Sequence, residues 1–422
     1  MKGFVTITLP LASVGFINQA ARMVLALIGP LLALEFGLSA SDLGLLAAVM
    51  FIAYAAAQLP VGVALDRYGP RRVQAVLCST AALGFGLCAM ADGPFMLGVG
   101  RVITGVGIAA ALMAMLTAHA RWFPRARVAA LTGGGVFIAS LGGMAATLPM
   151  QSLLPLVGWR GGFVILGVMT LAAAVWIWLS VPEDARPAGP APARSLAREI
   201  AAFGPILTHP DFLRFTPPII VLSTMNFVYS GLWAGPWLRD VGGLDDGPRA
   251  LVLLIYAGGM AVGAIAIGQA ASLSQARGAS PLLVPMAAVV AQFVLQLVFI
   301  FVALPGWVAI AAVWFLFSFF GATGPIGYGA VGQRFGPELA GRVSTAINCA
   351  MLVLVFILQY VIGAILDLWP RTADGGWDPA GYGWAMGLTA VLQGGALLWA
   401  WRPWTGRPRT WRRGAVVPAS QP

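Results

Sequence analysis

The feature that most constrains this chain is a series of long apolar runs, each separated from the next by a short segment with charge, glycine or proline. A helix needs about 20 apolar residues to cross the hydrocarbon core of a bilayer. Counting runs on that basis predicts twelve membrane-spanning helices, at 10–34, 43–65, 72–91, 95–118, 128–154, 160–181, 213–238, 248–271, 281–303, 307–332, 341–367 and 380–401. We therefore expect an all-α membrane protein.

Composition excludes several classes of protein. Apolar residues make up 59% of the chain and charged residues 9%, whereas a soluble domain has about 25% charged residues. The net charge of +10 does not indicate a nucleic-acid partner, because the arginines are spread over alternate loops. The three cysteines lie in apolar runs without the spacing of metal ligands. Without a nucleophile–base pair, a metal cluster or a phosphate loop, we expect neither an enzyme nor a cofactor.

A long polar segment divides the twelve runs into two sets of six. We expect an N-terminal bundle at 1–181, a cytoplasmic linker at 182–212, a C-terminal bundle at 213–402 and a basic cytoplasmic tail at 403–422. Within the linker, Ser195–Phe203 has the pattern of a short amphipathic helix on the membrane surface.

The distribution of basic residues predicts the orientation in the membrane. If the N-terminus is cytoplasmic, nineteen Lys and Arg residues fall in or near cytoplasmic loops and termini and four fall outside. Cytoplasmic loops carry the excess of positive charge. Both termini are therefore expected in the cytoplasm, and the protein in the inner membrane of a bacterium.

The connector after the second run reads Gly-Val-Ala-Leu-Asp-Arg-Tyr-Gly-Pro-Arg-Arg, from residue 62 to residue 72. Its glycines suit a tight turn and close approach of helices. The spacing resembles the loop G-x-x-x-D-R-x-G-R-[RK] of the major facilitator superfamily, with Pro70 as the one intrusion. The matching residues are Gly62, Asp66, Arg67, Gly69, Arg71 and Arg72.

The resemblance implies two pseudo-symmetric six-helix bundles that rock about a central site. It also implies that Asp66 lies against the start of the eleventh helix, near Glu338 to Arg342, and latches the outward-open state. The corresponding loop between the eighth and ninth spans, at 268–278, is degraded and has lost the acid. A similar sequence, Gly363-Ala-Ile-Leu-Asp367, ends the eleventh span.

Arg22, in the middle of the first span, is the first candidate for binding a ligand. A charge at that depth costs several kcal/mol unless it faces water or a partner, and no Asp or Glu lies in the central third of any predicted span. The planar fork of arginine matches a carboxylate or phosphate. The alternative is that Arg22 snorkels or is a packing device held by carbonyls and by Asn18 or Gln19.

The sequence around Arg22 resembles the anion:cation symporters and the nitrate/nitrite porters of that superfamily. Their first span often carries an Arg before a Leu/Ala-Gly-Pro run, here ending at Pro30. Sugar-acid symporters have an Asp before this Arg, which is implied to bear the coupling proton. Ala21 occupies that position, so proton coupling by that route is not expected.

Polar and aromatic residues at helical spacing complete the candidate site, with hydrogen bonding between helices as the alternative role of each. The candidates are Asn18, Tyr54, Gln58, Asn226, Tyr229, Trp233, Tyr256, Tyr328, Asn348 and Gln359. Arg101 begins a match to a second signature, R-x-x-x-G-x-G, which implies a part in conformational change or proton transfer; a structural role is the alternative. His119 and His209 lie near cytoplasmic ends and are expected to be solvated.

These residues favour a transporter that moves a small organic anion, such as a carboxylate, by alternating access. We expect a monomer in the lipid bilayer, with uniport, symport or antiport and a coupling proton or ion all left open. One alternative is an exporter of amphipathic drugs or metabolites. A second is a membrane receptor or assembly partner that transports nothing.

Overall fold

The computed structural model describes residues 3–183 and 203–402. All but the last residue of the predicted linker helix Ser195–Phe203, and the whole of the predicted tail at 403–422, lie outside the described residues. The predicted bounds of the linker and of the two bundles stay predictions. Each predicted span lies almost wholly in helix, and the predicted all-α membrane fold is confirmed. Eight of the helical stretches are long and apolar enough by themselves to cross a membrane.

The first group of helices, which we call the N-half, contains six of the predicted spans. Its elements are η1 (Phe4–Thr8), α1 (Leu9–Phe36), α2 (Ala40–Ala89), α3 (Pro94–Gly107), α4 (Ala111–Trp122), α5 (Arg125–Ala145) and α6 (Leu148–Ser180). Here α2 contains both the second and the third predicted span.

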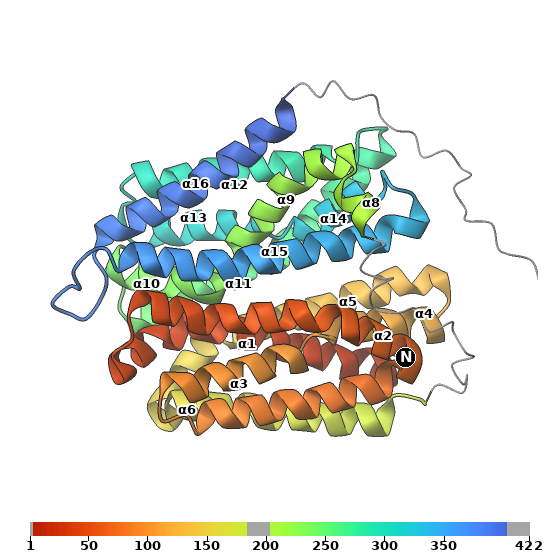
Figure 1. Cartoon of the computed structure of the whole chain (residues 1–422), viewed down its shortest axis with the longest axis horizontal. Coiled ribbons are helices and arrows are strands. Elements are labelled where there is room, and N and C mark those ends of the chain that lie inside the picture. Colours follow the sequence, from red (N-terminus) through yellow and green to blue (C-terminus); the bar gives the residue numbers. More distant parts are fainter. Residues whose placement is uncertain (1–2, 184–202, 403–422) are drawn as a thin grey trace, which may run out of the picture.

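The second group, which we call the C-half, contains the other six spans. Its elements are α8 (Gly204–Leu207), α9 (Pro210–Val228), η2 (Tyr229–Trp233), α10 (Ala234–Asp240), α11 (Asp246–Ala276), α12 (Leu283–Phe301), α13 (Gly306–Gly321), α14 (Gly324–Gly332), α15 (Pro337–Leu366) and α16 (Pro379–Trp401). Figure 1 shows the N-half below the C-half, with α15 at the contact between them.

The Gly62–Arg72 connector is a kink inside α2. Gly69 has a φ of 76° and a ψ of 163°, outside the helical region, so the chain turns there. Glycine adopts this conformation without steric cost. Pro70 follows as the first residue of the next helical segment, a position where its missing N–H is not needed. Gly62, also expected to permit a tight turn, lies within helical residues, and a Cβ atom added there would have open space around it.

The two halves are joined at the end of the bundle opposite this connector. Asp367, just after α15, accepts hydrogen bonds from the backbone N–H groups of Ala40 and Ser41 at the start of α2, at 2.8 and 2.9 Å. Arg371 donates a hydrogen bond to the carbonyl of Leu38. We call this the Asp367 end, and the end that carries Gly69 the loop end.

Candidate functional site

Arg22 is buried within α1, with 8% of its surface exposed. Among the described residues, no Asp or Glu forms an ion pair with its guanidinium. Its side chain points toward the C-half, because its guanidinium carbon lies 4.9 Å from the ring centroid of Phe227 on α9. The positive charge therefore lies between the halves and does not face lipid.

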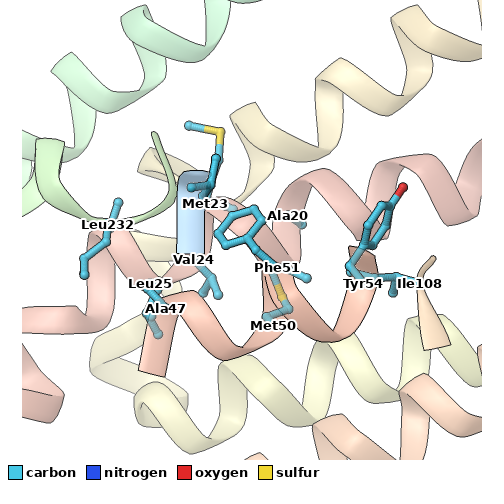
Figure 2. Packing of buried hydrophobic residues seen from close by; sticks show 14 of the residues in the cluster. Ala20, Met23, Val24, Leu25, Ala47, Met50, Phe51, Tyr54, Ile108 and Leu232 are labelled. Carbon is cyan, nitrogen blue, oxygen red and sulfur yellow. The ribbon is translucent and has the colours of Figure 1, made fainter. Parts of the chain in front are cut away.

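Aromatic rings surround the guanidinium. Its carbon is 4.9 Å from the centroid of Tyr54 and 5.8 Å from that of Phe51, both on α2. Figure 2 shows Phe51 and Tyr54 projecting from the same side of α2, while Met50 points away. Phe51 and Phe227 contact each other edge to face across the two halves, with centroids 6.3 Å apart. Cation–π contacts stabilise a buried arginine without neutralising it.

The two polar candidates of the N-half, Asn18 and Gln58, differ in whether their side chains form hydrogen bonds. Gln58 lies one helical turn from Tyr54 and is 7% exposed; among the described residues, no hydrogen bond to its amide is found. Asn18 instead donates to the carbonyl of Ile108 at 3.2 Å, which ties α1 to the break between α3 and α4. Asn18 is thus engaged within the N-half, whereas the predicted part of Gln58 in binding a ligand stays a prediction.

Three polar candidates in the C-half bond to one another or to neighbouring helices. The hydroxyl of Tyr256 donates to the side-chain oxygen of Asn226 at 2.7 Å. The hydroxyl of Tyr229 accepts from Nε2 of Gln296 at 3.1 Å and lies 3.2 Å from Oγ1 of Thr389. The structure places these three candidates inside the C-half, where, among the described residues, Nδ2 of Asn226 is the one side-chain polar atom of the three without a partner.

Trp233 and Gln359 are also paired within the C-half. The indole N–H of Trp233 donates to the carbonyl of Gln359 at 3.2 Å, and Nε2 of Gln359 donates to the carbonyl of Val228 at 3.1 Å. Asn348 is partly exposed on α15. Tyr328, on α14, is 9% exposed and lies within electrostatic range of Arg22.

Arg101 lies directly behind the candidate site. It is 1% exposed on α3, and its Nη1 donates to the carbonyl of Ala21 at 2.9 Å. Because Ala21 precedes Arg22, this bond fixes the backbone that carries the candidate ligand-binding charge. The predicted part of Arg101 in conformational change stays a prediction.

The charged residues of the connector lie at the loop end. Asp66 is exposed and has no hydrogen bond or ion pair with any described residue. Arg71 and Arg72 both pair with Glu183, the former at 3.8 Å, which joins the connector to the segment after α6. The guanidinium of Arg67 lies 5.2 Å from the ring centroid of Tyr68.

His119 is buried, so the expectation that it is solvated was wrong. It is 0% exposed, and its two ring nitrogens lie 3.0 Å from the hydroxyls of Thr8 and Thr132. The position of His119 near a charged loop suggested exposure, but α4 turns it inward between η1 and α5. His209 is partly buried and accepts a hydrogen bond from the backbone N–H of Asp211 at the start of α9.

Sequence reasoning did not single out Phe51 and Phe227, which contact Arg22 from the two halves. Both are apolar residues within apolar runs, so nothing in the sequence distinguishes them from their neighbours. A weak signal existed for Phe51, because it lies three residues before Tyr54 and therefore on the same helix face.

Comparison with solved structures concerns the fold, because each likeness is under 25% identical. A bacterial homologue of the human lysosomal transporter Spinster, in an inward-facing and occupied conformation, superposes with a TM-score of 0.71 at 17% identity, covering 93% of this chain and 95% of the other. A D-xylose–proton symporter gives a TM-score of 0.71 at 16% identity, covering 94% and 97%.

Comparison with sequences finds named transporters. A probable sulfoacetate transporter of Cupriavidus necator is 30% identical over 37% of this chain and 36% of its own length. A gallate transporter of Pseudomonas putida is 27% identical over 58% and 60%. The chain thus matches from about a third to three fifths of the length of these relatives. The family model described as Major Facilitator Superfamily matches residues 11–358, and the chain belongs to that superfamily.

Proposed function

We propose that this protein carries a small organic anion across the membrane by alternating access, with Arg22 binding its carboxylate or a similar acid group. The observation that carries the proposal is the buried guanidinium of Arg22, which has no acidic partner among the described residues and lies between the halves. An arginine offers two parallel N–H donors to a carboxylate.

The names of the relatives support an anionic solute. Sulfoacetate, gallate, L-galactonate and hexuronate, named for four transporters with partial sequence similarity, are all acids. They differ in size and in the number of hydroxyl groups. Their common feature is the acid group, which is the part of a solute that Arg22 would bind.

The position of Arg22 also supports alternating access. Phe51 and Tyr54 belong to the N-half and Phe227 belongs to the C-half, so rearrangement of the halves changes the surroundings of the cation. A solute bound to Arg22 would therefore be bound differently in each state, which is the requirement for coupling binding to a conformational change.

Orientation and location follow from the charge count. The loop end carries Arg67, Arg71, Arg72 and Arg121, and an excess of positive charge marks the cytoplasmic side. We therefore place the loop end and both termini in the cytoplasm, with the protein in the inner membrane of a bacterium. The Asp367 end then faces outward.

The test is uptake of a panel of radiolabelled small acids, amines and neutral solutes into vesicles containing the purified protein. The variants are Arg22→Lys, which keeps the charge but not the fork, and Arg22→Ala. We expect uptake of an acid, with its affinity falling about tenfold in Arg22→Lys and about a hundredfold in Arg22→Ala.

Arg277→Ala is the matched control, because Arg277 is exposed at the far end of α11. Its uptake should equal that of the wild type. Uptake restricted to amines or neutral solutes, or acid uptake that is unchanged in Arg22→Ala, would rule out the proposed function.

A further inference from the structure

The rings around Arg22 narrow the class of anion. We infer that the solute is a carboxylate on a flat, aromatic body and not a polyhydroxylated acid; this inference rests on the proposed function. Phe51, Tyr54 and Phe227 all have ring centroids within 5.8 Å of the guanidinium carbon, and Tyr328 lies within its electrostatic range. An acid bound to Arg22 must therefore extend along aromatic surface.

An aromatic acid can pack against these rings while it binds Arg22. Its carboxylate would accept the N–H donors of Arg22 while its ring packs against Phe227, which is partly exposed, or against Tyr54. Edge-to-face and offset contacts between rings stabilise such a pair beyond the burial of apolar area. Phe51 and Phe227 already use the edge-to-face geometry with each other, at an interplanar angle of 85°.

The supply of hydrogen-bonding groups argues against a polyhydroxylated acid. Close to Arg22, among the described residues, we find the hydroxyls of Tyr54 and Tyr328 and the amide of Gln58, which is fewer groups than such an acid has hydroxyls. On α9, Ser223 donates to the carbonyl of Ile219 at 2.9 Å, and the side-chain oxygen of Asn226 accepts from Tyr256. Gln58 retains its amide. A sugar acid carries four or more hydroxyls, and each one buried without a partner costs binding free energy. Gln58 suits a single ring substituent.

The experiment measures inhibition of uptake, or thermal stabilisation, by four acids that each carry one carboxylate on a six-membered ring: benzoate, 4-hydroxybenzoate, cyclohexanecarboxylate and glucuronate. We expect the two aromatic acids to act at concentrations about tenfold lower than cyclohexanecarboxylate, and glucuronate to be weakest. Phe227→Leu keeps an apolar side chain but removes the ring. It should weaken the aromatic acids about threefold to tenfold and leave cyclohexanecarboxylate unchanged.

Phe301→Leu is the control, because Phe301 is 77% exposed at the end of α12. Glucuronate acting as strongly as benzoate, with dependence on Arg22, would overturn the aromatic class and leave the proposed function intact. An equal loss of potency of benzoate and cyclohexanecarboxylate in Phe227→Leu would also overturn the aromatic class. If no acid inhibits uptake or stabilises the protein, or if every acid acts equally on the wild type and on Arg22→Ala, the proposed function and the aromatic class are both overturned.

A separate observation, at the Asp367 end, carries a second inference. The carboxylate of Asp367 binds the first N–H groups of α2, so a residue of the C-half caps a helix of the N-half. Negative charge is stabilising at a helix N-terminus. The helices also approach closely here, since a Cβ atom at Gly363 or Gly44 would collide with backbone of the other half.

The same five-residue pattern ends at both carboxylates. Gly62-Val-Ala-Leu-Asp66 and Gly363-Ala-Ile-Leu-Asp367 match at Gly, Leu and Asp. In this structure Asp367 caps a helix, whereas Asp66 is exposed and a Cβ atom at Gly62 would meet nothing within 4 Å. The geometry points to Asp367 as a latch that holds the Asp367 end closed while Asp66 is disengaged.

The test is the rate at which a small maleimide labels a single cysteine in detergent solution, in a variant with Cys78, Cys88 and Cys349 replaced by serine. Ala40→Cys reports on the Asp367 end, because Ala40 is 0% exposed at the start of α2 and its backbone lies against Asp367 and Gly363 of the C-half. We expect Asp367→Asn to raise its labelling about tenfold, which corresponds to losing one charge-assisted hydrogen bond. Asp66→Asn should not raise it.

Asp374→Asn is the matched control, since Asp374 is exposed in the loop after α15. A second reporter, Ser344→Cys, lies toward the loop end of α15 and should label no faster in Asp367→Asn. Unchanged labelling of Ala40→Cys, an equal rise in Asp374→Asn, or a rise at both reporters would each overturn the latch.

Discussion

In the N-half, α2 and α3 pack backbone against backbone, as α11 and α13 also do at Gly259 and Gly263 of the C-half. By contrast, α12 and α16 are joined by side-chain hydrogen bonds. A Cβ atom at Gly84 would lie 2.6 Å from the backbone nitrogen of Thr104, and one at Gly105 would collide with the carbonyl of Met50. Such contacts leave no room for side chains. Small residues allow this close approach of helices in membranes.

The C-half fills its interior with large polar and aromatic side chains. Gln296 donates to Oγ1 of Thr389 at 2.7 Å and to the carbonyl of Met386 at 3.3 Å. Trp314 packs against the rings of Phe299 and Tyr229, with centroids 4.4 and 5.5 Å away. The comparison teaches that the α12–α16 contact depends on side chains that hydrogen-bond across it, although Oε1 of Gln296 and Oε1 of Gln393 have no partner among the described residues. The α2–α3 contact depends on small residues instead.

The largest effect is expected where the N-half packs on backbone. Gly105→Val puts a branched side chain against the carbonyl of Met50, and overpacking of this kind costs about 3 kcal/mol or more, since backbone must move. We expect little folded protein, measured as the monodisperse peak in size-exclusion chromatography and as a lower unfolding temperature.

Gly86→Val is the control, because Gly86 lies on α2 with nothing within 4 Å of a Cβ atom. It should fold with an unfolding temperature near that of the wild type. If both valine variants behave alike, helix propensity and not the α2–α3 contact explains the loss, and the contrast between the α2–α3 and α12–α16 contacts fails.

An intermediate effect is expected in the C-half. Gln296→Leu removes the donor to Thr389, Tyr229 and Met386 while keeping the volume similar. Side-chain hydrogen bonds within membranes contribute about 0.6 kcal/mol on average, so the loss should lower the free energy of unfolding by about 1–2 kcal/mol. Thermal unfolding in detergent measures it. Gln333→Leu, at an exposed position, should change little, and an equal shift in both variants would contradict the network.

The spans were predictable because the length and hydrophobicity of a run are local properties of the sequence. The presence of a charge within a membrane-spanning helix, at Arg22, was predictable for the same reason, because a charged residue in an apolar run is a local feature of the sequence. The turn at Gly69 was foreseen, and Pro70, which interrupts the expected pattern, proved to begin the next helical segment.

Contacts between distant segments were not predictable from the sequence. Helical spacing predicted which face of its helix Asn226, Tyr229 or Tyr256 lies on, but not which neighbouring helix that face packs against. In the structure, these side chains form hydrogen bonds to other residues of the C-half. The contact of Asp367 with Ala40 joins residues 327 positions apart and depends on how the halves are arranged. No local pattern contains that information.

The smallest effect on stability is expected for Arg101→Met, although Arg101 is among the most buried residues of the described chain. Arg101 makes one hydrogen bond, to the carbonyl of Ala21, and its Nε and Nη2 have no partner among the described residues. Replacing a buried charge by an apolar side chain of similar volume is often neutral or stabilising, because the cost of desolvation disappears. We expect the free energy of unfolding to change by less than about 0.5 kcal/mol.

Transport should nevertheless fall in Arg101→Met, because the carbonyl that precedes Arg22 loses its anchor. Comparing the unfolding temperature with the KM and maximal rate of acid uptake separates the two effects. A raised KM with unchanged stability would show that the N-half keeps a second buried arginine to position the first. A fall in stability as large as that of Gly105→Val would instead make Arg101 part of the packing that Gly84 and Gly105 permit between α2 and α3.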